Sequence, residues 1–206
     1  MSHAEADMAI RFGASAIGLV GRMPSGPGII SDELIHKIAA AVPPPVATFL
    51  LSSETTTDGI FKHHQRVQTN TIQIVDTPEI SVYQHLRRAL PFIKLVQVIH
   101  VRDEHSIETA LQVAEHVDAL LLDSGNPNLK IKELGGTGRV HNWELSRKIR
   151  QQVKKPVFLA GGITKDNVGY ALETVGPFGI DVCSGVRSNG KLDERKLEQF
   201  IKAIFA

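Results

Sequence analysis

The stretch Ala119-Leu120-Leu121-Leu122-Asp123-Ser124-Gly125 consists of an apolar run, one acid and a turn. The apolar run is typical of a buried strand in a parallel sheet. Asp-Ser-Gly favours a turn, so we expect the strand to end there. The stretch therefore predicts a strand with Asp123 at its carboxyl end, where the acid is either a turn former or a reacting group.

Three glycine-rich turns follow other apolar runs. They are Leu134-Gly135-Gly136-Thr137-Gly138, Leu159-Ala160-Gly161-Gly162-Ile163 and Val182-Cys183-Ser184-Gly185-Val186. Because glycine has no Cβ, backbone N–H groups at such turns can approach a phosphate closely, although tight strand-to-helix packing is the alternative role. The pattern predicts a phosphorylated substrate and a proton-transfer step that uses Asp123. The predicted phosphate-binding residues are Gly136, Gly138, Gly161, Gly162, Ser184 and Gly185.

Short apolar runs alternate with amphipathic stretches along the whole chain, which predicts βα units around a parallel sheet. The seven expected strands are Ala16–Val20, Val46–Leu51, Thr71–Val75, Ile93–Val101, Ala119–Leu122, Pro156–Ala160 and Gly179–Cys183. The eight expected helices are Ala4–Phe12, Ser31–Ala41, Glu54–Arg66, Glu79–Leu90, Ser106–His116, Trp143–Val153, Asp166–Val175 and Asp193–Phe205. Because a helix comes first, the chain starts as if just after the first strand of an eightfold barrel.

The sequence therefore predicts one domain over 1–206, a (β/α)8 TIM-barrel type that lacks its first strand. An open doubly wound sheet is the alternative, because it needs no eighth strand. A missing barrel strand leaves two sheet edges without partners. These edges predict either pairing between chains, which gives a homo-oligomer, or a loosened barrel beside Ala16–Val20.

The composition excludes several classes of function. A net charge of +1 and only 5% aromatic residues argue against a nucleic-acid partner. No apolar run reaches the roughly 18 residues of a membrane span. The single cysteine, Cys183, cannot form an internal disulfide, which favours a cytoplasmic location. Histidines such as His63 and His64 fall on expected helix faces without a zinc-ligand pattern, so we expect them exposed and predict no metal site.

Several motifs follow one another in an order that is specific to one family. They are Leu121-Leu122-Asp123-Ser124, Gly135-Gly136-Thr137-Gly138, Asn142-Trp143, Leu159-Ala160-Gly161-Gly162, Asp166-Asn167-Val168 and Asp181-Val182-Cys183-Ser184-Gly185-Val186. With these motifs the chain resembles the phosphoribosylanthranilate isomerase family, (β/α)8 barrels of tryptophan biosynthesis. The segment from Ala9 to Gly18 is also similar to the family's first helix and second strand.

The resemblance implies an Amadori rearrangement of an aminoaldose phosphate to an aminoketose phosphate. An acid protonates the ring oxygen and a base removes the proton from C2′. The acid of the family matches Asp123, and the resemblance implies no metal or redox cofactor. The long segment from Gly125 to Asn142, which contains Gly136-Thr137-Gly138, is expected to be a mobile lid over the site, with a flexible surface loop as the alternative.

The sequence departs from the family pattern in three places. The family's catalytic base is a cysteine in a Lys-Ile-Cys-Gly run that ends the first strand, and this run is absent. Gly28 stands where the family has an arginine that binds the anthranilate carboxylate. Of the family's Gln-Leu-His-Gly, only Gln73 is kept among the polar residues.

These departures leave alternatives open. If the natural start lies upstream of Met1, we expect the full protein to carry the missing strand and to be an ordinary isomerase; if the chain is complete, catalysis needs another base. Two rival functions are a non-catalytic phosphosugar-binding barrel and an isomerase or epimerase of another phosphosugar. Cys183 is a candidate substitute base, although a cysteine in an apolar strand is usually inert. His100, Arg102 and Arg187 are candidates to reach the ligand.

Overall fold

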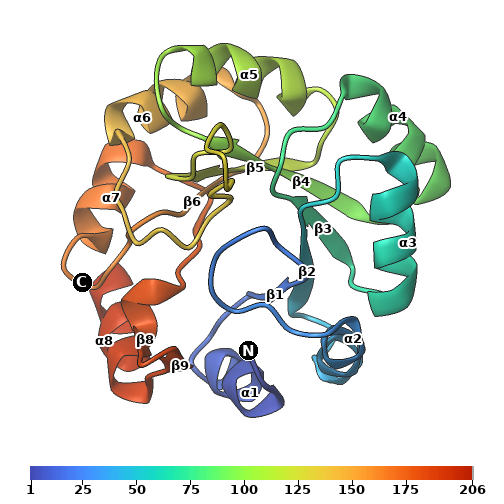
Figure 1. Ribbon diagram of the computed structural model, residues 1–206. Helices are drawn as coiled ribbons and strands as arrows, with labels where there is room; N and C mark the ends of the chain where they lie inside the picture. The colour runs from blue at the N-terminus through green and yellow to red at the C-terminus, as the bar shows by residue number, and fades with distance from the viewer. Residues whose placement is uncertain (206) are drawn as a thin grey trace.

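The computed structural model describes residues 1–205 and contains one large parallel sheet that curls into an incomplete barrel (Figure 1). Its strands, in both chain order and sheet order, are β1 (Ala16–Val20), β2 (Ala47–Ser52), β3 (Thr71–Ile74), β4 (Lys94–His100), β5 (Ala119–Asp123), β6 (Val157–Leu159) and β7 (Gly179–Ile180). The order never reverses, so the doubly wound alternative is wrong and the barrel prediction is confirmed.

Helices form the outer ring around this sheet (Figure 1). They are α1 (His3–Arg11), α2 (Asp32–Ala41), α3 (Thr57–Val67), α4 (Ile80–Ala89), α5 (His105–Ala114), α6 (Trp143–Gln152), α7 (Val168–Val175) and α8 (Glu194–Ile204). No helix within residues 1–205 is both long enough and apolar enough to cross a membrane. The expected seven strands and eight helices are therefore present, with ends shifted by a few residues.

The chain between β7 and α8 differs from the prediction. A short 3-10 helix, η1 (Ser184–Val186), leads into an antiparallel pair, β8 (Arg187–Ser188) and β9 (Lys191–Leu192). The turn between β8 and β9 is Asn189-Gly190, with positive φ at both residues, as a two-residue hairpin requires. Strand β7 is also shorter than expected, because its outer edge has no neighbouring strand to extend the ladder.

Successive side chains of each strand point alternately to an outer core under the helices and to the barrel interior. On β5, Leu120 and Leu122 pack outward in the main hydrophobic core under the helices, whereas Ala119 and Leu121 pack inward. By the same alternation Asp123 faces the interior. The inward cluster consists of Val75, Val96, Val98, Ala119, Leu121, Leu134 and Ala160, with Met23, Phe49, Leu51 and Phe158 packed against it.

The interior is open between β1 and β7, which do not pair with each other. After β7, Ile180 and Val182 pack toward the outer core, so the side chains of Asp181 and Cys183 point inward. Both inward side chains are exposed to solvent. The missing strand therefore leaves polar groups of the interior accessible from the open edge.

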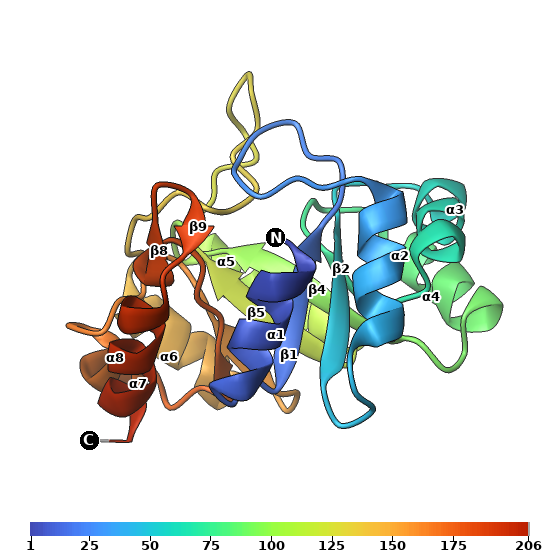
Figure 2. The ribbon, with the colours of Figure 1, turned by 90° about the horizontal axis from the view of Figure 1, so that it is seen from below.

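Helix α1 spans part of this opening by contacting the hairpin β8–β9 (Figures 1 and 2). Glu5 Oε1 accepts a hydrogen bond from Leu192 N at 2.7 Å and from Arg187 Nη1 at 3.0 Å. Arg187 also donates to the carbonyl of Gly190 at 2.8 Å. Arg187, a sequence candidate for the ligand site, is therefore committed to the contact between α1 and the hairpin.

We expect Glu5→Ala to lower the free energy of unfolding at pH 7 by about 1–3 kcal/mol, because it removes charged hydrogen bonds. Burial alone would raise the pKa of Glu5, but the Leu192 N–H and Arg187 outweigh burial and lower it. Its stabilisation is therefore present above the unfolded pKa and is lost as pH falls through the lower folded pKa.

Urea unfolding of the wild type and the variant between pH 3 and pH 7 tests this expectation. The difference between the two proteins should shrink in acid. Glu33→Ala, which removes an exposed helix acid paired with Lys37, is the control and should change little. Equal stabilities of the Glu5 variant and the wild type at pH 7 would contradict the bridging role.

Candidate active site

Asp123 is the last residue of β5 and lies opposite His100 in the register with β4. It is buried, with 7% of its surface exposed. Its Oδ1 accepts a hydrogen bond from Ser124 N at 2.7 Å. The structure therefore places the predicted acid inside the mouth of the barrel, at the carboxyl ends of the strands.

The surroundings of Asp123 favour its protonated form. Burial raises the pKa of its carboxyl above the usual range, although the Ser124 N–H and the nearby His100 oppose this effect. A carboxyl whose pKa moves toward neutrality can donate a proton at the pH of a cell. The geometry and the charge environment together suit a general acid.

Glycine backbone surrounds the Asp123 carboxyl on two sides. A Cβ at Gly161, after β6, would lie 2.9 Å from Oδ1, and a Cβ at Gly135 would lie 2.9 Å from Oδ2. Both glycines have positive φ, at 81° and 145° respectively. Only glycine fits at these two positions, so part of the glycine pattern is explained by close packing on the acid.

Four of the predicted phosphate-binding residues lie in segments whose backbones come close together. They are Gly138, Gly162, Ser184 and Gly185. A Cβ at Gly138 would lie 3.7 Å from Ser184 Oγ. A Cβ at Gly185 would lie 2.1 Å from the Ile163 carbonyl oxygen, and one at Gly162 would lie 2.6 Å from the Arg139 backbone. Backbone from the segment after β5, the turn after β6 and η1 therefore meets at one end of the barrel mouth.

Gly136 is placed differently from the other predicted phosphate residues. A Cβ there would lie 2.7 Å from Pro27 Cδ, in the loop between β1 and α2. Ser25 of the same loop donates a hydrogen bond to the Lys132 carbonyl at 2.5 Å. Lys132 Nζ also pairs with Asp76 Oδ2 at 2.5 Å. The loop after β1 and the segment after β5 thus contact each other at the barrel mouth, where Figure 2 shows both rising.

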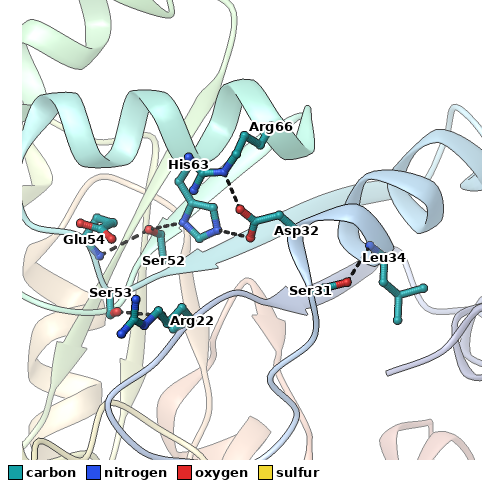
Figure 3. Close-up of polar contacts among 9 residues, drawn as sticks. All are labelled: Arg22, Ser31, Asp32, Leu34, Ser52, Ser53, Glu54, His63 and Arg66. Carbon is teal, nitrogen blue, oxygen red and sulfur yellow. Dashed lines mark hydrogen bonds and ion pairs between the residues drawn. The ribbon is translucent and has the colours of Figure 1, made fainter.

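A buried polar chain ties β2 to the start of α2 (Figure 3). Ser52 Oγ lies 3.0 Å from His63 Nδ1, and His63 Nε2 lies 3.1 Å from Asp32 Oδ1. Arg66 Nε donates to Asp32 Oδ2 at 2.6 Å. The set resembles a serine–histidine–aspartate triad, but Ser52 has no exposed surface, so no substrate can reach it. The chain is structural.

The prediction that His63 and His64 are exposed is wrong, since both are buried. His63 packs against Gly21, where a Cβ would lie 2.4 Å from the imidazole Cε1. Burial lowers the pKa of His63, and the opposing charge of Asp32 does not reverse this. His64 Nε2 donates to the Thr69 carbonyl at 2.8 Å. Helical periodicity could not reveal neighbours such as Gly21 and Asp32, which come from distant parts of the chain.

Two other sequence candidates, His100 and Arg102, lie at the end of β4 and just after it. His100 Nε2 donates to the Val75 carbonyl at 2.9 Å, and burial lowers the pKa of its imidazole. Arg102 lines a separate cavity of about 190 Å³ beside α5, which Ser106 and Thr109 also line. His100 nevertheless lies next to Asp123, because it is opposite Asp123 in the register and packs on Gly125, where a Cβ would lie 2.4 Å from its Nδ1.

Asp181 is an acid of the barrel interior for which the sequence suggested no role. Although part of its surface is exposed at the open edge, the protein atoms that desolvate its carboxyl, together with the charge of Asp123, raise the pKa of Asp181 to about 6. Burial also raises the pKa of the Cys183 thiol, although Arg187 opposes it. The thiol therefore remains protonated near neutral pH, which argues against Cys183 as a base. The sequence does contain one indication of this position. Asp181 stands two residues before Cys183, and alternate residues of a strand face the same side of the sheet.

A family model and curated relatives are similar to this chain over most of its length. A family model described as N-(5′-phosphoribosyl)anthranilate (PRA) isomerase matches residues 7–203. N-(5′-phosphoribosyl)anthranilate isomerase 2 of Methanosarcina mazei is 35% identical over 96% of this chain and 87% of the relative. The isomerase of Methanocella arvoryzae is 31% identical over 93% of this chain and 88% of the relative.

Solved structures show the same similarity. The phosphoribosylanthranilate isomerase of Thermotoga maritima is 28% identical, with a TM-score of 0.83, over 100% of this chain and 95% of that one. A second isomerase structure is 26% identical, with a TM-score of 0.81, over 99% of this chain and 94% of that one. The latter is a complex with reduced 1-(o-carboxyphenylamino)-1-deoxyribulose 5-phosphate.

Proposed function

This chain belongs to the N-(5′-phosphoribosyl)anthranilate isomerase family, and we propose that it converts that substrate to 1-(o-carboxyphenylamino)-1-deoxyribulose 5-phosphate. The observation that carries the proposal is the position of Asp123. It is a buried acid with a raised pKa, and glycine turns meet beside it at the barrel mouth.

The reaction needs one proton delivered and one removed. Asp123 donates its proton to the ring oxygen, so that the bond between C1′ and this oxygen breaks and an iminium forms between C1′ and the nitrogen. A base then takes the proton from C2′, and the resulting enolamine becomes the ketone when C1′ gains a proton and the hydroxyl on C2′ loses its proton. Asp181 is an inward-facing, titratable group that suits the role of base better than the protonated thiol of Cys183.

The phosphate of the substrate is proposed to bind at the turns after β6 and β7. Gly161, Gly162 and Gly185 supply backbone there without a Cβ, Gly138 adds backbone from the segment after β5, and Ser184 adds a hydroxyl group. Gly161 and Gly162 both have positive φ, a backbone conformation that glycine adopts without strain. Gly136 is left out of this set because it packs on Pro27.

We further propose a cytoplasmic location and pairing between chains. The free thiol of Cys183 is exposed, which fits a reducing compartment. The edges of β1 and β7 carry no neighbouring strand, and such edges tend to pair with another chain. Sedimentation analysis tests the oligomeric state directly.

A non-catalytic phosphosugar-binding protein is the second candidate, and the open edge between β1 and β7 favours it. Such a protein would bind the phosphate but leave the substrate unchanged. Product formation distinguishes the two functions, because only the isomerase forms product.

Complementation of a tryptophan auxotroph that lacks its own isomerase tests the proposal. We expect the gene for this chain to restore growth without tryptophan and the Asp123→Asn variant to fail. The protein level of both must be equal on a blot. If neither form restores growth while the purified chain binds inorganic phosphate, the binding protein is the correct function.

A further inference from the structure

We propose that Thr137, acting through Ser124, fixes the carboxyl of Asp123 so that Oδ2 is the oxygen that delivers the proton, an inference that rests on the proposed function. Ser124 directly follows the acid, whereas Thr137 comes from the long segment after β5. Neither hydroxyl has to touch the substrate for this role. Thr137 is a positioning residue, and its effect is measured on the protonation of the acid.

Oδ1 is the carboxyl oxygen of Asp123 that the protein holds. It accepts a hydrogen bond from Ser124 N at 2.7 Å and a longer one from Ser124 Oγ at 3.4 Å. A carboxyl oxygen that accepts from both an N–H and an O–H is the unprotonated oxygen of the acid form. The proton that is donated therefore resides on Oδ2.

The two hydroxyl groups form a chain with one direction. Thr137 Oγ1 accepts from Arg139 N at 3.2 Å and lies 2.7 Å from Ser124 Oγ. Each hydroxyl carries one hydrogen, and that of Ser124 is directed at Asp123 Oδ1. The hydrogen in the short contact is therefore that of Thr137, which donates to Ser124, and Ser124 donates to the acid.

The two carboxyl oxygens of Asp123 lie against different segments. A Cβ at Gly161, in the turn after β6, would lie 2.9 Å from Oδ1. A Cβ at Gly135, in the segment after β5, would lie 2.9 Å from Oδ2. The hydrogen bonds to Oδ1 oppose rotation of the carboxyl, so they keep Oδ2 on the side of the segment that carries Thr137.

The chain also stabilises the carboxylate that remains after the proton has left. Hydrogen bonds to an ionised group are stronger than those to a neutral one, and each hydroxyl in a chain polarises the next. Burial raises the pKa of Asp123, whereas the backbone N–H and the hydroxyl of Ser124 oppose this effect. Loss of the Thr137 hydroxyl therefore raises the pKa of the acid further.

Three other titratable side chains face Asp123, from three different elements. His100 is its partner in the register with β4. Asp181, after β7, has a pKa that burial and the charge of Asp123 raise to about 6. His141, before α6, has its Nδ1 3.1 Å from the position of a Cβ at Gly161. All three stay in place when Thr137 is changed, so a shift in the titration of the acid is assigned to the hydroxyl chain.

The pH dependence of kcat tests this role. The protonated acid is the active form, so kcat falls as pH rises through the pKa of Asp123 in the substrate complex. We expect Thr137→Val to lower kcat about two- to tenfold with little change in KM, and to move this fall to higher pH. Thr137→Ser keeps the hydroxyl and should restore the wild-type kcat and pH profile.

Carboxyl NMR with ¹³C-labelled aspartate gives a second measurement that needs no substrate. The Asp123 signal is assigned by its loss in Asp123→Asn, and it should titrate at higher pH in Thr137→Val than in the wild type. Thr174→Val, in α7 of the outer ring, is the matched control and should change neither measurement.

The outcomes separate this role from the proposed function. If Thr137→Val keeps both the pH profile and the carboxyl titration of the wild type, the role of Thr137 is overturned while the proposed function stands. If the wild type forms no product, the proposed function is overturned, and an unchanged carboxyl titration in Thr137→Val overturns the hydroxyl chain as well.

Discussion

Asp123→Asn is expected to lower kcat for N-(5′-phosphoribosyl)anthranilate by about a hundred- to ten-thousand-fold, which is the usual contribution of a general acid. Asparagine keeps the shape of the side chain and can still accept the hydrogen bond from Ser124 N. It cannot deliver a proton to the ring oxygen. The measurement is the rate of product formation at saturating substrate.

The same variant should not be less stable than the wild type. Burial raises the pKa of Asp123, so folding disfavours its ionised form, and stability falls as pH rises through the folded pKa. Asparagine removes this penalty above that pH. Asp7→Asn, on the exposed surface of α1, is the matched control and should keep full activity. An Asp123 variant with unchanged kcat would rule out the acid role.

Gly185→Ala is expected to weaken phosphate binding more than tenfold and to destabilise the protein by about 1–3 kcal/mol. The new Cβ would lie 2.1 Å from the Ile163 carbonyl oxygen and 3.1 Å from its carbonyl carbon. Both atoms belong to the backbone of the turn after β6, so relief requires η1 and this turn to move apart. Calorimetry with inorganic phosphate and urea unfolding measure the two effects.

Gly169→Ala in α7 is the control for this substitution. A Cβ at Gly169 would meet nothing within 4 Å. Alanine favours the helix over glycine by up to about 1 kcal/mol, so this variant should be equally or more stable and should bind phosphate normally. Normal phosphate binding by Gly185→Ala would remove η1 from the phosphate site.

Local sequence signals predicted the regular elements well. Ser31 was expected to begin a helix, and its side chain accepts from Leu34 N at 3.2 Å as the N-cap of α2. The apolar run before Asp123 forms β5, buried along its length. These features depend on neighbours in sequence, so spacing and residue type are sufficient to reveal them.

Features that depend on distant contacts could not be predicted in this way. His63 is buried because it packs on Gly21 and forms a hydrogen bond with Asp32. Both residues are distant from His63 in the sequence. Lys132 pairs with Asp76 across 56 positions of sequence. Asp181 gains its raised pKa from the enclosing strands and from Asp123, neither of which its local sequence shows.

The decisive measurement is a single-turnover reaction of the purified wild-type chain, in excess, with N-(5′-phosphoribosyl)anthranilate at pH 7. If Asp123 works as the acid in this barrel, the carboxyphenylamino-deoxyribulose phosphate forms faster than in a parallel reaction with the Asp123→Asn variant. Equal rates of product formation in the two reactions, with phosphate still bound by both proteins, would contradict that role.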